Sequence, residues 1–245
     1  MLKKLLNGAR MLQRTGLRAT ARECAYRINN AYLEHRLGVS TSGFLDNESL
    51  GYADADCVHY APLGYRQIRD AFQRLSLNWA ECTLLDYGCG KGRAVVVAAT
   101  MPFRRVIGVE LSEPLFAEAK ANVANMRRRR ADAVDLHCLN ATEYEVPPDV
   151  NVIYFYNPFR GPILKQVLLN IRDSVRKSPR RIHILFFNRD NFERIAEGFP
   201  EITAVEHIRV YPNIGRGIYV IDPDTSAHTG QLAQIGSRSR THCTP

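Results

Sequence analysis

The stretch LLDYGCGKGRAVVVAA, residues 84–99, places three glycines at alternate positions after an apolar run that ends in an acid. The acid is Asp86, and the glycines are Gly88, Gly90 and Gly92. Glycine permits positive φ and lets a ligand touch the backbone, and a helix that starts after Gly92 presents unpaired N–H groups. The pattern therefore indicates a tight turn over which a ligand lies close to the main chain.

A second acid, Glu110, closes the next apolar run, 18 residues after Gly92. A carboxylate at that place can accept hydrogen bonds from both hydroxyls of a ribose. The ordered set of strand, acid, glycines, helix, strand and acid indicates a nucleoside-bearing ligand, whereas a plain turn with a solvent-facing carboxylate is the alternative. The spacing argues against a dinucleotide site, because the third glycine comes one residue too early for G-x-G-x-x-G and Arg93 stands at that position. A P-loop is excluded, since its motif does not occur, and a nicotinamide dehydrogenase is a remote alternative.

Alternating strand and helix patterns must position these residues. Strand-like runs lie at 82–88, 105–111, 134–141, 150–159 and 181–188, and helical patterns at 65–77, 92–99, 114–130 and 163–176. The alternation predicts right-handed crossovers and a parallel sheet covered by helices on both faces. Two further runs, 204–211 and 217–223, are joined by a link too short for a crossover, so the sheet should end in an antiparallel hairpin.

The two ends of the chain differ from this core. Apolar residues recur at helical spacing on both sides of Gly16, which predicts two amphipathic helices, and residues 1–37 carry eight Lys and Arg against two acids. This basic segment can dock on the chain's own domain, lie on an anionic membrane as a peripheral contact, or serve as an import signal. We expect an N-terminal helical extension with a connecting segment at 1–59, one domain at 60–223 and a disordered tail at 224–245.

Composition limits the class of protein. The 245 residues are 45% hydrophobic and carry a net charge of +8, most of it in the basic extension, so the core gives no strong nucleic-acid signal. The run Arg127–Arg130 is interpreted as a solvated helix end, with an RNA-binding patch as the alternative. The six cysteines and seven histidines lack metal-binding spacing, so no metal is assigned, and we expect a soluble cytoplasmic protein; mitochondrial and membrane-peripheral locations are the alternatives.

Asp86 and the three glycines match acid-x-G-x-G-x-G, the first motif of the class I S-adenosylmethionine-dependent methyltransferases, and the sequence resembles this family over residues 60–223. The resemblance implies an enzyme with a Rossmann-like, mostly parallel sheet of seven strands, the last of them antiparallel. It also implies S-adenosyl-L-methionine as cofactor. In the family pattern the glycine turn approaches the methionine part of the cofactor, Asp86 supports that turn, and Glu110 holds the ribose.

The resemblance extends to further cofactor contacts. Asn140 and Ala141 follow the third strand, where many members of the family have an aspartate that faces the adenine amino group. Asparagine can still accept a hydrogen bond there, and a plain turn is the alternative. Tyr60 lies in a segment that in similar methyltransferases folds over the cofactor, with core packing as the alternative. Lys91 and Arg93 can meet the cofactor carboxylate or face solvent.

Asn157, Pro158 and Phe159, directly after the fourth strand, resemble the N-P-P-[YF] motif of methyltransferases that modify amino nitrogen, with one proline instead of two. An amide oxygen and a backbone carbonyl can both accept N–H bonds and so orient a nitrogen lone pair. Pro158 stiffens the loop, and Phe159 can stack on the substrate or on a cation. An ordinary strand-ending turn is the alternative.

The predicted activity is methyl transfer to an amine, either a protein lysine or a small-molecule amino group. Its partner is thus a protein or small-molecule methyl acceptor, and no oligomeric state is predicted. The alternatives are an O-methyltransferase for a sugar or lipid-linked precursor and a non-catalytic, cofactor-binding scaffold. Methyl transfer needs no nucleophilic triad, but a base can help if the amine arrives protonated. Candidates for that base are His59, Tyr60, Glu143 and Glu145.

Overall fold

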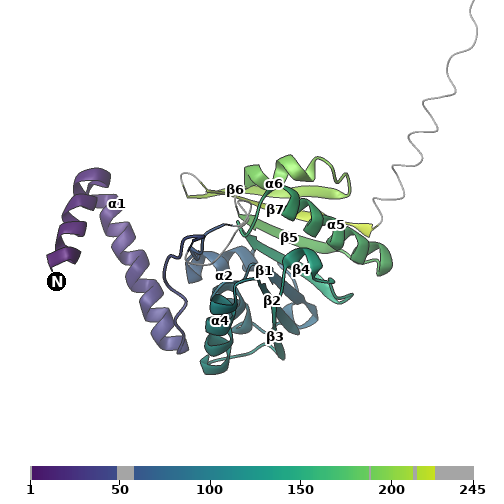
Figure 1. The fold of residues 1–245 in the computed structure, drawn as a ribbon, viewed down its shortest axis with the longest axis horizontal. Helices are drawn as coiled ribbons and strands as arrows, with labels where there is room; N and C mark the ends of the chain where they lie inside the picture. Colours follow the sequence, from purple (N-terminus) through teal and green to yellow (C-terminus); the bar gives the residue numbers. More distant parts are fainter. Residues whose placement is uncertain (1, 49–57, 188, 212–213, 224–245) are drawn as a thin grey trace, which may run out of the picture.

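The computed structural model describes residues 2–48, 58–187, 189–211 and 214–223. The predicted tail, 224–245, lies outside the described residues. The rest forms a seven-stranded sheet with helices packed against it, and a long helical segment, α1 (Leu2–Leu37), stands at one side (Figure 1). This is the α/β architecture that the sequence predicts.

The sheet has the strand order β3-β2-β1-β4-β5-β7-β6. The first five of these strands pair in parallel, and β7 runs antiparallel to both of its neighbours, which confirms the predicted terminal hairpin. The strands are β1 (Thr83–Tyr87), β2 (Arg105–Glu110), β3 (Ala133–Cys138), β4 (Val150–Tyr156), β5 (Ile182–Phe187), β6 (Ile202–Tyr211) and β7 (Ile214–Ile221). The chain order reverses between β1 and β4, which is where ligands bind in open parallel sheets.

Helices cover both faces of the sheet, and each face has its own apolar cluster. Successive strand residues point to opposite faces, so Leu84 and Tyr154 pack in one cluster while Leu85 and Phe155 pack in the other. The first cluster lies under α2 and α3 and the second under α5 and α6. The helices after α1 are α2 (Tyr65–Gln73), α3 (Arg93–Ala99), α4 (Glu113–Asn125), α5 (Gly161–Lys177) and α6 (Arg189–Ala196), with short 3-10 turns η1 (Trp79–Glu81) and η2 (Ala141–Glu143).

The structure differs from the predicted elements mainly at helix ends. Helix α4 ends at Asn125 instead of residue 130, because Met126 turns to an extended conformation and the Arg127 N–H donates to the Leu37 carbonyl at 2.7 Å. The Arg127–Arg130 run is therefore not the end of a helix, and its interpretation as one was wrong. Helix α6 was not predicted from the sequence, and β7 starts three residues before the predicted run.

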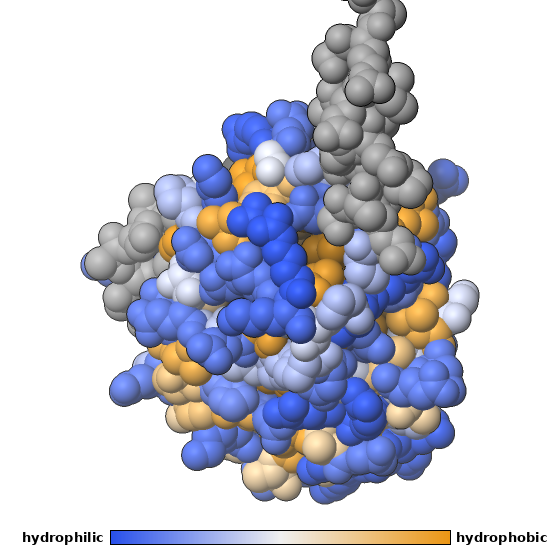
Figure 2. Space-filling view, turned by 90° about the vertical axis from the view of Figure 1, so that its right-hand side faces the viewer, coloured by the Kyte–Doolittle hydropathy of each residue, from blue (hydrophilic) through white to orange (hydrophobic). Residues whose placement is uncertain are grey.

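The extension is helical on both sides of Gly16, whose φ of 78° and ψ of 165° break α1 there as the sequence predicts. No helix among the described residues is both long enough and apolar enough to cross a bilayer. Beyond the break, Leu17, Ile28 and Tyr32 are 74%, 70% and 58% exposed. On the face of the molecule away from α1, hydrophilic surface prevails and apolar residues form scattered small patches (Figure 2).

One buried arginine fastens the extension to the sheet domain. Arg93, in the first turn of α3, is 4% exposed and donates to Glu34, Thr41, Ser42 and the Leu63 carbonyl at 2.8–3.1 Å. Its guanidinium also lies 4.7 Å from the centre of the Tyr65 ring. The Glu34 carboxylate in turn accepts hydrogen bonds from the backbone N–H and the hydroxyl of Thr41. The end of α1 and the segment after it are thus docked on the domain, while the preceding turns of α1 expose their apolar side.

This anchor predicts a specific pattern of stability. The Arg93→Met variant leaves the largely buried Glu34 carboxylate without its cation, which should cost about 3 kcal/mol of unfolding free energy. The Glu34→Gln/Arg93→Met double variant should lose less than the Arg93→Met single variant, because no unpaired charge remains. Urea unfolding measures both. Arg27→Met is the control, since the Arg27–Glu23 pair is exposed and worth at most about 1 kcal/mol. Equal losses in Arg93→Met and Arg27→Met would contradict the anchor.

Candidate functional site

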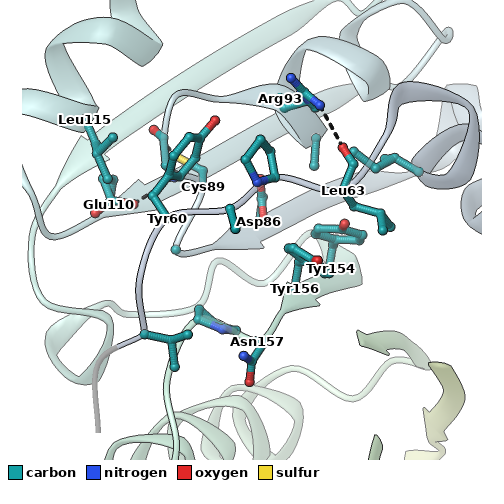
Figure 3. A pocket seen from close by; sticks show the side chains of 18 of the residues that line it. Tyr60, Leu63, Asp86, Cys89, Arg93, Glu110, Leu115, Tyr154, Tyr156 and Asn157 are labelled. Carbon is teal, nitrogen blue, oxygen red and sulfur yellow. Dashed lines mark hydrogen bonds between the residues drawn. The ribbon is translucent and has the colours of Figure 1, made fainter. Parts of the chain in front are cut away.

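A cavity of about 270 Å³ opens at the carboxyl ends of β1, β2 and β4, at the point where the strand order reverses. Its wall is formed by the glycine turn, by the ends of these strands, by residues 58–63 and by parts of α2, α3 and α4. Figure 3 shows Tyr60, Glu110 and Leu115 close together and Asn157 well apart from them, beyond Tyr154 and Tyr156. The structure therefore brings the predicted turn, its two acids and the N-P-F loop to one cavity.

The glycine turn has the backbone that only glycine adopts readily. Gly88, Gly90 and Gly92 have φ values of 69°, 57° and 79°. The N–H groups of Gly88 and Cys89 both donate to the carbonyl of Val109 at 2.9 and 3.0 Å, so hydrogen bonds hold the turn against the end of β2. The three glycines are thus required by conformation before any ligand is considered.

Close neighbours explain why side chains are excluded as well. A Cβ on Gly88 would lie 2.5 Å from the Pro158 Cβ, and a Cβ on Gly90 would lie 2.3 Å from the Tyr60 ring. The N-P-F loop and the segment around Tyr60 therefore rest directly on the turn from two sides. The bare backbone serves this internal packing and, between the two contacts, lines the cavity.

Glu110 links the two strand ends. Its side chain is 3% exposed, and its two oxygens accept hydrogen bonds from the Gly90 N–H at 2.7 Å and the Ser112 N–H at 2.9 Å. It lines the cavity, as the sequence predicts, but it also holds the middle of the glycine turn. Because each carboxylate oxygen can accept more than one hydrogen bond, ribose hydroxyls can add to these contacts.

Asp86 is the most unusual charge in the site. It is 2% exposed and lines the cavity, and no group among the described residues donates a hydrogen bond to its carboxylate. Burial, reinforced by the charge of Glu110, raises the pKa of Asp86 well above its usual value. Burial, followed by the charges of Asp86 and Glu110, also raises the pKa of the Cys89 thiol. A cationic group placed in the cavity would relieve this excess of negative charge.

Tyr60 forms a roof over the turn. Its backbone pairs with Leu45 in both directions at 2.9 and 3.1 Å, and its hydroxyl donates to the Thr41 carbonyl. The Lys91 ammonium lies 5.7 Å from its ring centre and forms an ion pair with Glu118 at 2.8 Å. Burial raises the pKa of Tyr60, so this phenol keeps its proton at neutral pH and is a poor base. Lys91 and Arg93 each have a carboxylate partner from the protein.

The three residues of the N-P-F loop take different positions. Asn157 has a φ of 47°, a conformation that asparagine tolerates better than most residues, and it lines the cavity together with Pro158. The Pro158 carbonyl accepts the Val58 N–H at 3.3 Å. Phe159 is 6% exposed, and its ring meets the rings of Tyr87 and Phe155 edge to face in the apolar cluster under α5. The predicted contact of Phe159 with a substrate is thus not supported; the ring anchors the loop.

Asn140 and Ala141 lie outside the cavity wall. The Asn140 oxygen accepts from the backbone N–H and the hydroxyl of Thr142 at 3.0 and 2.9 Å and caps the η2 turn. This geometry favours the turn role that was left open for Asn140. Glu143 and Glu145 line a separate cavity beside α5, whereas His59 and Tyr60 line the cavity at the strand ends. Among the four candidate bases, only His59 combines access to the site with a suitable chemistry.

Sequence reasoning missed several residues of the wall. Tyr154 and Tyr156 both face the cavity from the end of β4, and Cys89 and Leu115 add apolar surface next to Glu110. Period two along β4 carries the signal, because Tyr154 and Tyr156 share the face of Asp86 in β1, while Phe155 belongs to the opposite face.

Comparison with known proteins agrees with this site. A family model described as "Methyltransferase domain" matches residues 84–178, which include the glycine turn, Glu110 and the N-P-F loop. Residues 84–178 are thus similar to methyltransferase domains. The strand order and the terminal hairpin described above give the chain a Rossmann-like sheet.

Curated relatives match short parts of the chain. A stretch of 84 residues, 30% of this chain, is 36% identical to the ribosomal protein L11 methyltransferase of Thiobacillus denitrificans (strain ATCC 25259 / T1), and a stretch of 55 residues, 20% of the chain, is 40% identical to the protein of the same name from Dechloromonas aromatica (strain RCB). The matches span 26% and 19% of those proteins. The chain thus covers about a quarter or less of these relatives.

A solved structure has a similar fold. The geranyl diphosphate C-methyltransferase from Streptomyces coelicolor A3(2), in complex with Mg²⁺, geranyl diphosphate and S-adenosyl-L-homocysteine, is similar with a TM-score of 0.50 and 13% identity. The likeness covers 64% of this chain and 78% of that one. At this identity the similarity concerns the fold alone.

The raised pKa of the buried Asp86 predicts an effect on stability. Because its folded-state pKa lies above the unfolded value, the native state binds the proton more tightly, and Asp86 lowers stability as pH rises from about 4 through the folded pKa. Asp86→Asn should therefore raise the melting temperature at pH 7 by about 2–4 °C, the shift for ~1 kcal/mol in a protein of this size. Asp132→Asn, at an exposed position, is the control. A lower melting temperature for Asp86→Asn in differential scanning fluorimetry would contradict the assigned pKa.

Proposed function

We propose that the protein is an S-adenosylmethionine-dependent methyltransferase that transfers a methyl group to an amino nitrogen. The observation that carries the proposal is the union of two features at one cavity. The glycine turn with Asp86 and Glu110 suits a nucleoside that bears positive charge, and the Asn157–Pro158 loop offers acceptors for an amine across the same cavity. The matched methyltransferase family model supports the same chemistry.

The residues present fit S-adenosyl-L-methionine. Asp86, buried and without a donor among the described residues, faces the cavity and can balance a cationic ligand. Glu110 is fixed by two backbone N–H groups and can accept ribose hydroxyls, and Leu115 with Cys89 provides apolar surface for a flat ring beside it. When bound, this cofactor supplies an electrophilic methyl group on a sulfonium.

The chain's own residues contribute binding, orientation and exclusion of water. Tyr60 covers the glycine turn, and Tyr154 and Tyr156 line the cavity toward Asn157. Holding two reactants in a reactive geometry can contribute on the order of 7–11 kcal/mol, so positioning is the main task in such a transfer. His59 lies on the wall and can take a proton from an amine that arrives charged.

Several observations favour nitrogen as the acceptor atom. The Asn157 amide oxygen and the Pro158 carbonyl are both acceptors, which fit a group that has N–H donors to spare. Phe159 and the positive φ of Asn157 fix the loop that carries them. The two curated relatives, both named as methyltransferases of ribosomal protein L11, are consistent with a protein amino group as the substrate, although they match only short stretches.

The Glu110→Gln variant tests the cofactor site. Glutamine has one carbonyl oxygen, so either the Gly90 N–H or the Ser112 N–H loses its acceptor and the turn is distorted. The affinity for S-adenosylhomocysteine, measured by isothermal titration calorimetry, should fall about tenfold or more, which is ~1.4 kcal/mol. Glu113→Gln, at an exposed position in the first turn of α4, should keep the wild-type affinity. An unchanged affinity in Glu110→Gln would count against this role of Glu110.

The Asn157→Gly variant tests the acceptor side. Glycine keeps the positive φ but removes the amide, so the loop should fold while methyl transfer falls about 100-fold from lost positioning. Binding of S-adenosylhomocysteine should persist. The assay supplies radiolabelled S-adenosylmethionine and cell extract, and a labelled, acid-stable basic product supports an amine acceptor. A labelled sugar or lipid-linked product would instead indicate O-methylation, and cofactor binding without any transfer would indicate a scaffold.

A further inference from the structure

Five arginines surround a second cavity, of about 430 Å³, at the base of α1. They come from α1, from α2 and from the segment after α4, and no acidic residue lines the cavity. Its floor is apolar. The arginines, called here the arginine pocket, are Arg36, Arg66, Arg69, Arg128 and Arg130, and the other lining residues are Leu33, Leu37, Tyr65, Val97 and Thr100.

The charge of the arginine pocket is not balanced by the described part of the protein. All five side chains belong to exposed residues, and among the described residues none of them forms an ion pair with a carboxylate. The Arg69 guanidinium donates to the Thr100 hydroxyl. Burial, followed by the charges of Arg130 and Arg36, lowers the pKa of Arg69, which is the sign of like charges held close together.

The backbone contributes to this arrangement. Arg128 has a φ of 65°, an uncommon conformation for a residue with a side chain. It splits the run of four arginines: Arg128 and Arg130 line the arginine pocket, Arg127 lines a different cavity beside Gly38, and Arg129 donates to the carbonyls of Ala131 and Asp132. Two alternate arginines of the run thus point to the pocket. A run of arginines that only faces solvent would need no such arrangement.

We propose that the arginine pocket binds a phosphate ester, with guanidinium groups on the phosphate and the apolar floor under the group that carries it. Guanidinium forks bind phosphate oxygens in pairs, and several of them around one cavity suit a doubly charged anion. An anion also relieves the repulsion among the arginines, so it stabilises the fold. The cavity is larger than a single phosphate needs, and its floor of Leu33, Leu37 and Val97 suits an apolar or ring-bearing substituent.

Two sources share this chemistry, a soluble phosphorylated compound and a phospholipid headgroup. The exposed apolar side of α1 leads to the pocket, because Ile28, Tyr32 and Arg36 follow one another at four-residue spacing along the helix. A bilayer surface could therefore meet both the helix and the pocket. Helix α2 contributes to both cavities, since Ile68 lines the cavity at the strand ends and Arg66 and Arg69 line the arginine pocket. Binding of a phosphate in the arginine pocket does not depend on methyl transfer.

The test compares two variants of the full chain that remove equal charge from the same run. Arg128→Gln/Arg130→Gln changes the arginine pocket, and Arg127→Gln/Arg129→Gln does not. Inorganic pyrophosphate, followed by isothermal titration calorimetry, should bind the wild type, lose about tenfold or more in affinity with the first variant, and stay within about twofold with the second. Arg66→Gln, at an exposed position of α2, repeats the test if the first variant fails to fold.

A second arm separates the two sources. Co-sedimentation is measured with phosphatidylglycerol vesicles and with phosphatidylcholine vesicles. Binding of pyrophosphate with the expected difference between the variants supports a soluble phosphate ester, and the same difference seen only with phosphatidylglycerol vesicles supports a lipid headgroup. Absence of binding in both arms overturns the proposal. Equal losses of affinity in the two variants overturn it as well, because binding would then follow the net charge of the protein and not the arginine pocket.

Discussion

The glycine turn between β1 and α3 is the constraint on which the site depends. Its glycines have positive φ, a conformation that other residues seldom adopt, and the N–H groups of residues 88–90 already donate to Val109 and to the Glu110 carboxylate. One acid therefore fixes the shape of the turn and faces the space where a nucleoside would lie. The hydrogen bonds that fold the turn also fix the Glu110 carboxylate at the cavity, so this part of the site is formed before a ligand arrives.

A second constraint ties the distant parts of the chain to that turn. Arg93 occupies the position where a dinucleotide fingerprint would have glycine, and it uses its donors to hold residues from the end of α1 and from the segment that leads to the cavity. The extension is thus part of the folded domain, because Glu34 near the end of α1 forms an ion pair with Arg93 at the start of α3. The arginine pocket lies at the C-terminal end of α1, and the exposed apolar side chains of the same helix lie in the turns before it.

The sequence predicted the sheet, its final hairpin and the turn with its two acids because these features follow from local patterns: period two, period 3.6 and glycine spacing. It did not predict the partner of Arg93, since Glu34 lies 59 residues away and nothing in either neighbourhood reveals the contact. The end of α4 was misplaced for a similar reason, as Leu37 captures the Arg127 N–H from outside the helix. The buried position of Phe159 was not predictable either, because the chain turns at Asn157 after the end of β4 and the alternation of the strand stops there.

The position of Tyr60 has a consequence for the shape of the cavity. Its ring lies against Gly90, its main chain pairs with Leu45, and its hydroxyl donates to the Thr41 carbonyl. The Thr41 hydroxyl in turn accepts a hydrogen bond from Arg93. The wall over the glycine turn and the attachment of the helical extension therefore share one set of contacts, so a change in how the extension fits also changes the space left for a ligand.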